Sequence, residues 1–163
     1  MNIKIKKHLL LYKGYKLKCS LGKSGIRKKK KEGDLATPKG SFGIGNLYYR
    51  KDRLKKFKCK INKKIIRKNM GWCDDIKSNK YNMQITFPFK YSAEKLYRKD
   101  NIYDLFINIK YNHKPVIKGK GSAIFLHISN QNYYPTKGCV AISKKDFLKI
   151  LPLINKKTKI FIC

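Results

Sequence analysis

The amino-acid sequence predicts one domain of the mainly β or α+β class, spanning residues 1–163. The apolar runs are short and rich in the β-branched and aromatic residues typical of strands. Glycine, proline and asparagine interrupt them at short intervals, as expected for turns. A length of 163 residues with 42% hydrophobic residues is sufficient for one domain with its own core.

The strands are predicted from these short runs. A β-hairpin is expected within the first 20 residues, where residues 8–12 and 15–19 flank a Lys13-Gly14 turn. Further strands are expected at residues 105–110, 124–128 and 158–163.

Two short helices are also predicted. Ser92 is a suitable N-cap for a helix within residues 91–98. Ser143, with Asp146 three residues later, resembles a capping box for a second helix that ends before Pro152. Its apolar side chains are expected to face the core.

The formal net charge of +32 is the strongest feature of the composition. It favours an anionic partner such as nucleic acid, a membrane surface or a cell-wall polymer. Codon bias is an alternative explanation, because Lys, Ile, Asn, Tyr and Phe are abundant while Arg is scarce, as in AT-rich genomes. No zinc finger or RNP-like motif is present, so no dedicated nucleic-acid motif is identified. The run Lys28 to Lys31 is expected to be a solvated loop.

The amino terminus carries no visible signal peptide. After MNIKIKK only Leu9 to Leu11 are apolar, fewer than the 7–15 residues of a typical signal-peptide core. No run approaches the ~20 apolar residues of a transmembrane helix. These observations predict a soluble chain without a transmembrane segment.

The cysteines and glycines exclude several kinds of site. No two of the five cysteines have CxxC spacing, so no structural zinc and no other metal or cofactor is expected. An odd number leaves at least one thiol unpaired, and four could pair in three ways if the protein is exported. The glycine-rich stretch after residue 21 matches neither a P-loop nor a dinucleotide-binding motif. The sequence does not predict an oligomeric state.

A histidine and a cysteine stand out between Gly119 and Ser143. His127 ends an apolar run, and Cys139 follows Gly138 after a polar loop. A thiolate is the attacking form of cysteine, and its ordinary pKa of about 8.5 calls for a base such as histidine, whose pKa is about 6.5. Gly138 would let a substrate carbonyl approach the backbone N–H groups of an oxyanion hole. The alternative is that both side chains are ordinary buried residues.

The segment Thr136-Lys137-Gly138-Cys139-Val140-Ala141 resembles the catalytic motif of the L,D-transpeptidase (YkuD) family. Lys137 stands where that family usually has a second histidine, and Ala141 where it has a polar residue. A branch of peptidoglycan transpeptidase-like proteins carries the Pro-Thr-x-Gly-Cys-Val-Ala variant. The stretch from Glu32 to Phe42 is similar to the E-G-D-x-x-T-P-x-G-x-F signature of that branch.

The resemblance implies a YkuD-like catalytic fold of mixed β-sheets and a cysteine acyltransferase acting on peptidoglycan stem peptides. Cys139 would be the nucleophile, His127 the base and Gly138 part of the oxyanion hole, with Thr136 on the substrate side. Trp72 and Asp75 are further substrate-side candidates, because the branch shows a similar Gly-Trp-Cys-Asp-Asp segment. Adjacent aspartates on a strand point to opposite faces, which argues against a metal or glycosidase pair at residues 74–75.

Three alternatives remain open from the sequence. Attack by a second stem's amine on the thioester gives a cross-link, whereas attack by water gives L,D-carboxypeptidase activity. A non-catalytic basic protein that binds anionic polymer is the third. A cell-wall substrate implies the envelope or periplasm, which conflicts with the lack of a visible signal peptide. A mis-set start, another export route or a cytoplasmic muropeptide substrate would each resolve the conflict.

Overall fold

The computed structural model describes residues 2–28 and 31–163 and confirms the mainly β class. The strands are β1 (Ile3–Lys6), β2 (Leu9–Tyr12), β3 (Tyr15–Ser20), β4 (Ile26–Arg27), β5 (Thr37–Pro38), β6 (Gly40–Tyr49), β7 (Lys63–Ile65), β8 (Met70–Cys73), β9 (Gln84–Thr86), β10 (Ala93–Lys95), β11 (Leu105–Ile109), β12 (Phe125–Ile128), β13 (Val140–Ile142) and β14 (Lys159–Ile162). The helices are α1 (Lys144–Ile150) and the 3-10 turn η1 (Leu151–Leu153).

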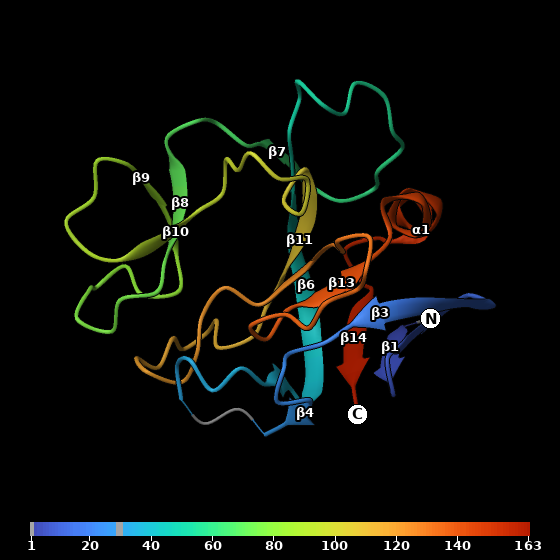
Figure 1. The fold of residues 1–163 in the computed structure, drawn as a ribbon, viewed down its shortest axis with the longest axis horizontal. Helices are drawn as coiled ribbons and strands as arrows, with labels where there is room; N and C mark the ends of the chain where they lie inside the picture. The colour runs from blue at the N-terminus through green and yellow to red at the C-terminus, as the bar shows by residue number, and fades with distance from the viewer. Residues whose placement is uncertain (1, 29–30) are drawn as a thin grey trace.

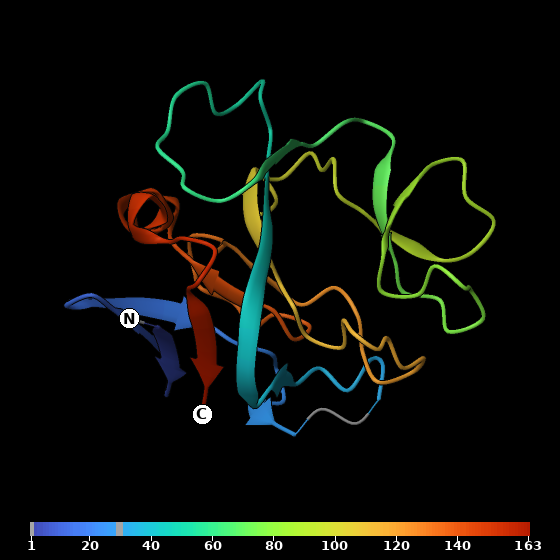
Figure 2. The same cartoon turned by 180° about the vertical axis from the view of Figure 1, so that it is seen from behind.

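The main sheet closes on itself through its longest strand. Its order is β11-β12-β13-β3-β2-β1-β14-β6-β7, and β11 also pairs with β6. The first part of β6, Gly40–Gly43, pairs with β14, while residues Ile44 to Tyr49 pair with β11. Figures 1 and 2 show β6 running through the centre of the fold between these neighbours. Closure removes most of the free strand edges that an open sheet would expose.

Side chains alternate between two apolar clusters along the strands that carry the site. On β11, Leu105 and Ile107 belong to the large core inside the closed sheet, whereas Phe106 belongs to a second cluster on the opposite face. On β12, Leu126 joins the core and Phe125 the second cluster. This is the period of two that a strand imposes. The second cluster connects the main sheet to a smaller one.

The smaller sheet has the order β10-β8-β9 and forms a separate lobe (Figure 1). The helix predicted within residues 91–98 is wrong, because Ala93–Lys95 is strand β10, which pairs antiparallel with β8. Ser92 does not cap a helix: its hydroxyl donates to Asp74 Oδ1 at 2.7 Å, and its backbone N–H donates to Asp75. Contacts with a neighbouring strand therefore override the local helix signal.

The other predicted elements agree with the structure. Strands β2 and β3 form the hairpin, and β14 closes the chain. Helix α1 begins after Ser143, whose hydroxyl accepts from the Asp146 N–H at 3.1 Å, and Phe147 and Ile150 are buried against the core. Pro152 falls in the 3-10 turn that follows the α-helix.

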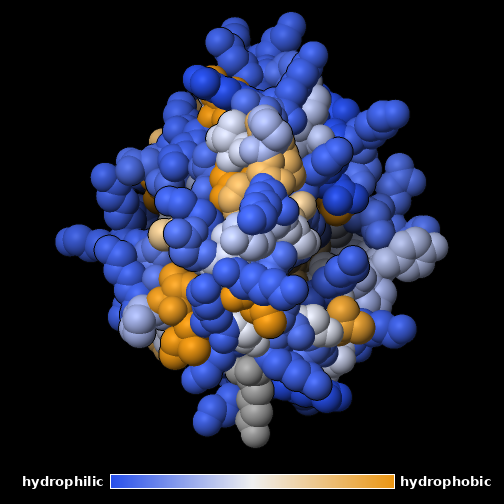
Figure 3. All heavy atoms as spheres, turned by 90° about the vertical axis from the view of Figure 1, so that its left-hand side faces the viewer, coloured by the Kyte–Doolittle hydropathy of each residue, from blue (hydrophilic) through white to orange (hydrophobic). Residues whose placement is uncertain are grey.

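The face of the molecule drawn in Figure 3 is dominated by hydrophilic side chains, with small apolar patches between them. Part of the predicted solvated lysine run, residues 29 and 30, lies outside the described residues. Among helices in the described ranges, none has the length and apolar character needed to cross a membrane.

Candidate active site

The two candidate catalytic side chains lie on neighbouring parallel strands. In the register of β12 and β13, Leu126 is opposite Val140 and His127 is opposite Ala141. Cys139 therefore lies one residue before β13, level with Phe125. Because Val140 faces the core, Cys139 and Ala141 face the other side, which is also the side of His127. Both residues are largely buried, at 8% exposure for Cys139 and 6% for His127.

The sulfur of Cys139 is held by the backbone of the segment that leads into β12. The Cys139 thiol donates to the carbonyl oxygen of Ala123 at 3.2 Å, and the Phe125 N–H donates to Sγ at 3.4 Å. These two contacts from alternate residues fix the sulfur beside the strand that carries His127. A thiol that donates to a carbonyl is protonated, so activation requires a base.

The ring of His127 is fixed in a tautomer suited to that role. Its Nδ1 lies 2.8 Å from the carbonyl oxygen of Ile128. A carbonyl can only accept, so Nδ1 carries the proton and Nε2 of the neutral ring holds a lone pair. Burial lowers the pKa of His127 to about 4, against a smaller raising effect of the Ile128 hydrogen bond. The ring is therefore neutral at pH 7.

His127 and Cys139 open into one cavity of about 780 Å³. Its wall combines the end of the polar loop before Cys139, the segment before β12, the loop between β4 and β5, the segment before β11 and the small sheet. The described residues that line it are Glu32, Gly33, Leu35, Asp74, Ser92, Glu94, Arg98, Ile102, Tyr103, Ser122, Ala123, Ile124, His127, Ser129, Asn130, Tyr134, Pro135, Thr136, Lys137, Cys139 and Ala141. A volume of this size accommodates a short peptide segment.

Thr136 shapes the turn that presents Cys139. Its hydroxyl donates to the carbonyl oxygen of Cys139 at 2.7 Å and accepts from the N–H of Gly138 at 3.1 Å. Its backbone N–H donates to Leu21, and its carbonyl accepts from Lys23. The turn is thereby tied to the loop after β3, and the N–H of Gly138 already has a partner in this state.

Gly138 has a backbone conformation that requires glycine. Its φ is +138°, and a Cβ at this position would lie 2.9 Å from the carbonyl oxygen of Ala36. Both features concern the residue directly before the candidate nucleophile. Position 138 therefore combines an unfavourable φ for other residues with a lack of space.

Gly138→Ala is expected to lower the free energy of unfolding by about 1–3 kcal/mol, because the strained φ and the contact with Ala36 add. Urea unfolding measures the effect. Gly119→Ala is a matched control, since Gly119 also has a positive φ, +80°, but a Cβ added there would meet no atom within 4 Å. If Gly138→Ala lowered the free energy of unfolding no more than Gly119→Ala, close packing against Ala36 would not explain the need for glycine at position 138.

A tyrosine and a glutamate form the wall nearest the small sheet. Tyr103 packs edge-on against His127, with ring centroids 5.4 Å apart, and its hydroxyl donates to Glu94 Oε1 at 2.7 Å. Burial raises the pKa of Glu94, which the Tyr103 hydrogen bond partly offsets. Burial also raises the pKa of Tyr103 well above its usual value, and negative charge at Cys139 acts in the same direction. Tyr103 therefore remains a neutral donor.

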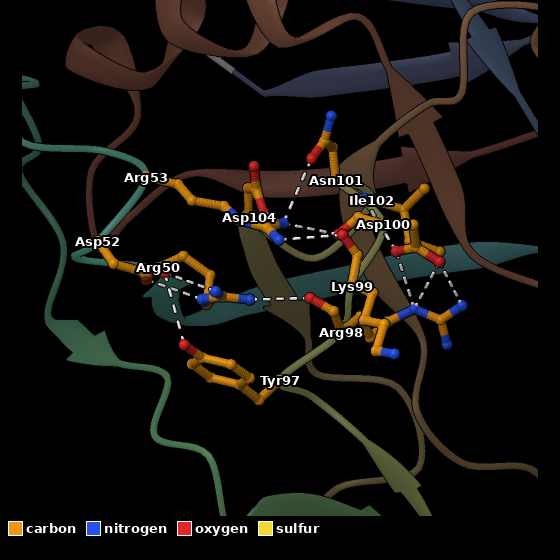
Figure 4. A network of polar contacts seen from close by, with 10 residues as sticks. All are labelled: Arg50, Asp52, Arg53, Tyr97, Arg98, Lys99, Asp100, Asn101, Ile102 and Asp104. Carbon is orange, nitrogen blue, oxygen red and sulfur yellow. Dashed lines mark hydrogen bonds and ion pairs between the residues drawn. The ribbon is translucent and has the colours of Figure 1, made fainter.

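Two arginines of the segment after β6 contact the chain between Arg98 and Asp104 (Figure 4). Arg50 donates to the carbonyl of Arg98 at 2.9 Å, and its own charge is paired with Asp52. Arg53 donates to the carbonyls of residues 99 and 100 and pairs with the buried Asp104 at 2.7 Å. This network fixes the backbone that positions Arg98 and Tyr103 in the cavity wall.

The two remaining substrate-side candidates do not line the cavity. Trp72 is buried behind it, packed edge-on against Phe125, and its Nε1 donates to Asn82 at 3.0 Å. Asp75 accepts from the backbone N–H groups of Lys77 and Ser92, which lowers its pKa. Its neighbour Asp74 does line the cavity.

Sequence reasoning did not assign Glu94, Arg98, Tyr103 or Asp74 to the site. Glu94 and Asp74 reach the cavity only through the pairing of β10 with β8, which leaves no local pattern in the sequence. The described residues contain no group of three or more His, Cys, Asp or Glu side chains arranged to hold a metal ion. The five cysteines are present as thiols.

The whole described architecture corresponds to one known family. The chain matches the YkuD family, the L,D-transpeptidase catalytic domain, over residues 3–162. The chain belongs to the YkuD family. No curated protein and no solved structure shows significant similarity to it.

Membership confirms the resemblance of the motif around Cys139 and accounts for the fold. YkuD domains are L,D-transpeptidase-type enzymes that act on peptidoglycan, so the chain is assigned to an enzyme family whose site of action is the cell wall. The match spans both the main sheet and the small sheet that completes the cavity.

Proposed function

We propose that this YkuD domain transfers acyl groups of peptidoglycan stem peptides through a thioester on Cys139, with His127 as the base. The observation that carries the proposal is the placement of both side chains on one face of adjacent strands, in one cavity. The Nδ1 contact with Ile128, which leaves the Nε2 lone pair available, supports the role of His127.

The acylation step follows from these two groups. Nε2 of His127 accepts the thiol proton as Sγ of Cys139 attacks the carbonyl that joins the third residue of the stem to its terminal D-alanine. The C–S bond forms, the C–N bond breaks, and His127 returns the proton to the departing amine of D-alanine. Burial lowers the pKa of His127 to about 4, so its ring is neutral and can accept the thiol proton as the attack begins.

Backbone N–H groups of Gly138 and Cys139 are the proposed oxyanion donors. One good donor contributes on the order of 3 kcal/mol to such a step. The N–H of Gly138 donates to Thr136 Oγ1 at 3.1 Å, so it must turn from that hydroxyl toward the substrate. Thr136 acts on the substrate side by controlling this donor.

Trp72 and Asp75 are proposed to act on the substrate indirectly. Trp72 supports Phe125, whose N–H contacts the sulfur, and Asp75 orients Ser92, which lines the cavity. The excess of basic residues over the surface attracts the carboxylates of stem peptides, an effect that weakens with salt. We place this activity in the cell envelope, where peptidoglycan lies.

A carbapenem-type acylating probe tests the proposal, because it presents an electrophilic carbonyl to the nucleophile. The expected result is one covalent adduct per chain, located by mass spectrometry on the peptide that contains Cys139. The Cys139→Ala variant should remain unlabelled. Labelling of another cysteine, or equal labelling of the variant, would remove Cys139 as the nucleophile.

A further inference from the structure

The candidate cavity has the opposite charge character from the rest of the chain. The sequence holds 41 Lys and Arg residues but only 9 Asp and Glu residues. Among the described residues that line the cavity, Glu32, Asp74 and Glu94 are acidic, and only Arg98 and Lys137 are basic. From the composition of the whole chain, basic residues would be expected to outnumber acidic residues in the cavity wall. The cavity is therefore suited to a ligand that carries a positive group.

The charge of Arg98 is largely balanced within the protein. Its Nε and Nη2 donate to the Asp100 carboxylate at distances from 2.6 to 3.1 Å. A bidentate pair of this kind is oriented and neutralised. Lys137 is exposed on the polar loop, so it is the remaining cationic group described at the cavity.

Glu94 is the cavity carboxylate that is connected to the proposed base. Tyr103, whose ring contacts His127, donates to Oε1 of Glu94 at 2.7 Å. Tyr103 itself is 4% exposed and is fixed by ring contacts with Phe106 and Phe125. One rigid side chain thus connects the proposed base to the acidic wall, and it places Glu94 on the side of the cavity that the small sheet forms.

We propose that Glu94 binds the ammonium group of the acyl acceptor and thereby directs the thioester toward transfer to an amine. This inference rests on the proposed acyl transfer at Cys139 and adds the residue that selects the second substrate. The acceptor class is a peptide with a primary amine on a side chain. Glu32 and Asp74 add two further carboxylates to the wall of the same cavity, and carboxylates attract a cationic ligand.

The proton balance of the second step is complete with the groups present. The bound ammonium gives one proton to the Glu94 carboxylate, which produces the neutral amine. The amine attacks the thioester carbonyl, the C–N bond forms and the C–S bond breaks. Nε2 of His127 accepts the second amine proton and passes it to the departing sulfur of Cys139. Glu94 then returns its proton to water.

The inference is tested by measuring how the acyl-enzyme divides between reaction with an amine and reaction with water. A tetrapeptide donor is supplied with increasing amounts of a tripeptide that ends in a diamino acid, and amide and hydrolysis products are quantified. In Glu94→Gln, which keeps an oxygen to accept from Tyr103, the ratio of amide to hydrolysis product should fall about tenfold, as expected for loss of one charge-assisted contact. Asp146→Asn changes the net charge equally but lies on helix α1, and should leave the ratio unchanged. An unchanged ratio in Glu94→Gln would overturn the inference.

A binding measurement separates this inference from the proposed reaction. In Cys139→Ala, which cannot be acylated, calorimetry compares the same tripeptide with its side-chain N-acetyl form. The free amine should bind about tenfold more tightly, and adding Glu94→Gln should remove that preference. Equal preference with and without Glu94→Gln overturns the role of Glu94, whatever the outcome of the acylation test. Failure of the carbapenem-type probe to label Cys139 bears on the nucleophile alone.

Discussion

His127→Ala is expected to slow acylation of Cys139 at pH 7 by about 10²–10⁴-fold, the contribution typical of a positioned general base. The wild-type thiol donates to the Ala123 carbonyl and must lose its proton during the attack. Without the imidazole, only water or hydroxide can take that proton. The measurement is the rate of adduct formation with the carbapenem-type probe, followed by mass spectrometry.

The pH dependence of the same reaction distinguishes a base from a merely structural residue. Since burial lowers the pKa of His127 to about 4, the wild-type imidazole stays unprotonated from pH 7 down to about 5. Its contribution is lost only as the pH falls through about 4. In His127→Ala the rate should instead rise steadily with pH. His113→Ala, which removes an exposed histidine from a turn, is the control. A wild-type rate in His127→Ala would exclude His127 as the base.

The orientation of each side chain of the candidate pair on its own strand is predictable from the sequence, because it follows the local period of two. Neighbouring side chains on a strand point to opposite faces. Since Leu126 and Val140 point into the core, His127 and Cys139 point away from it. What the sequence does not contain is the register between β12 and β13. A shift of one residue would turn Cys139 toward the core, so the common face depends on tertiary packing.

The acidic wall is unpredictable for the same physical reason. Residues 91–98 contain a helix N-cap and good helix formers, yet the backbone of Ala93–Lys95 pairs with β8. As a helix, this segment would present Glu94 differently. Its role in the cavity therefore follows from a long-range strand pairing and from the hydrogen bond to Tyr103, nine residues away in the chain.

Gly138 has a structural role beyond the one that sequence reasoning proposes for it. Sequence reasoning selects it for the access that a missing Cβ gives to a substrate. The structure adds a φ of +138° and close contact with Ala36, both of which are needed to pack the turn against the loop between β4 and β5. These requirements depend on a segment about 100 residues earlier, beyond the reach of a local motif.

The free energy of unfolding is expected to fall by about 3 kcal/mol between pH 6.5 and pH 4 because of His127 alone. In the folded chain burial holds its pKa at about 4, whereas in the unfolded chain it has its ordinary value of 6.5. Above pH 6.5 both states are neutral, and the effect is absent. As the pH falls from 6.5 to 4, His127 binds a proton in the unfolded chain but not in the folded chain. The free energy of unfolding therefore decreases. Below about pH 4 both states are protonated and the loss is complete.

Urea unfolding followed through the fluorescence of Trp72, the one tryptophan in the sequence, measures this dependence. The informative quantity is the difference between wild type and His127→Gln at each pH. Glu94, whose pKa is raised by burial, has the opposite pH dependence, and His113, whose pKa is lowered, has the same sign as His127. Both are retained in the variant, so their contributions cancel in the difference. Parallel curves for the two proteins from pH 7.5 to 4 would show that His127 titrates alike in the folded and unfolded chains, and would contradict a buried, neutral imidazole beside Cys139.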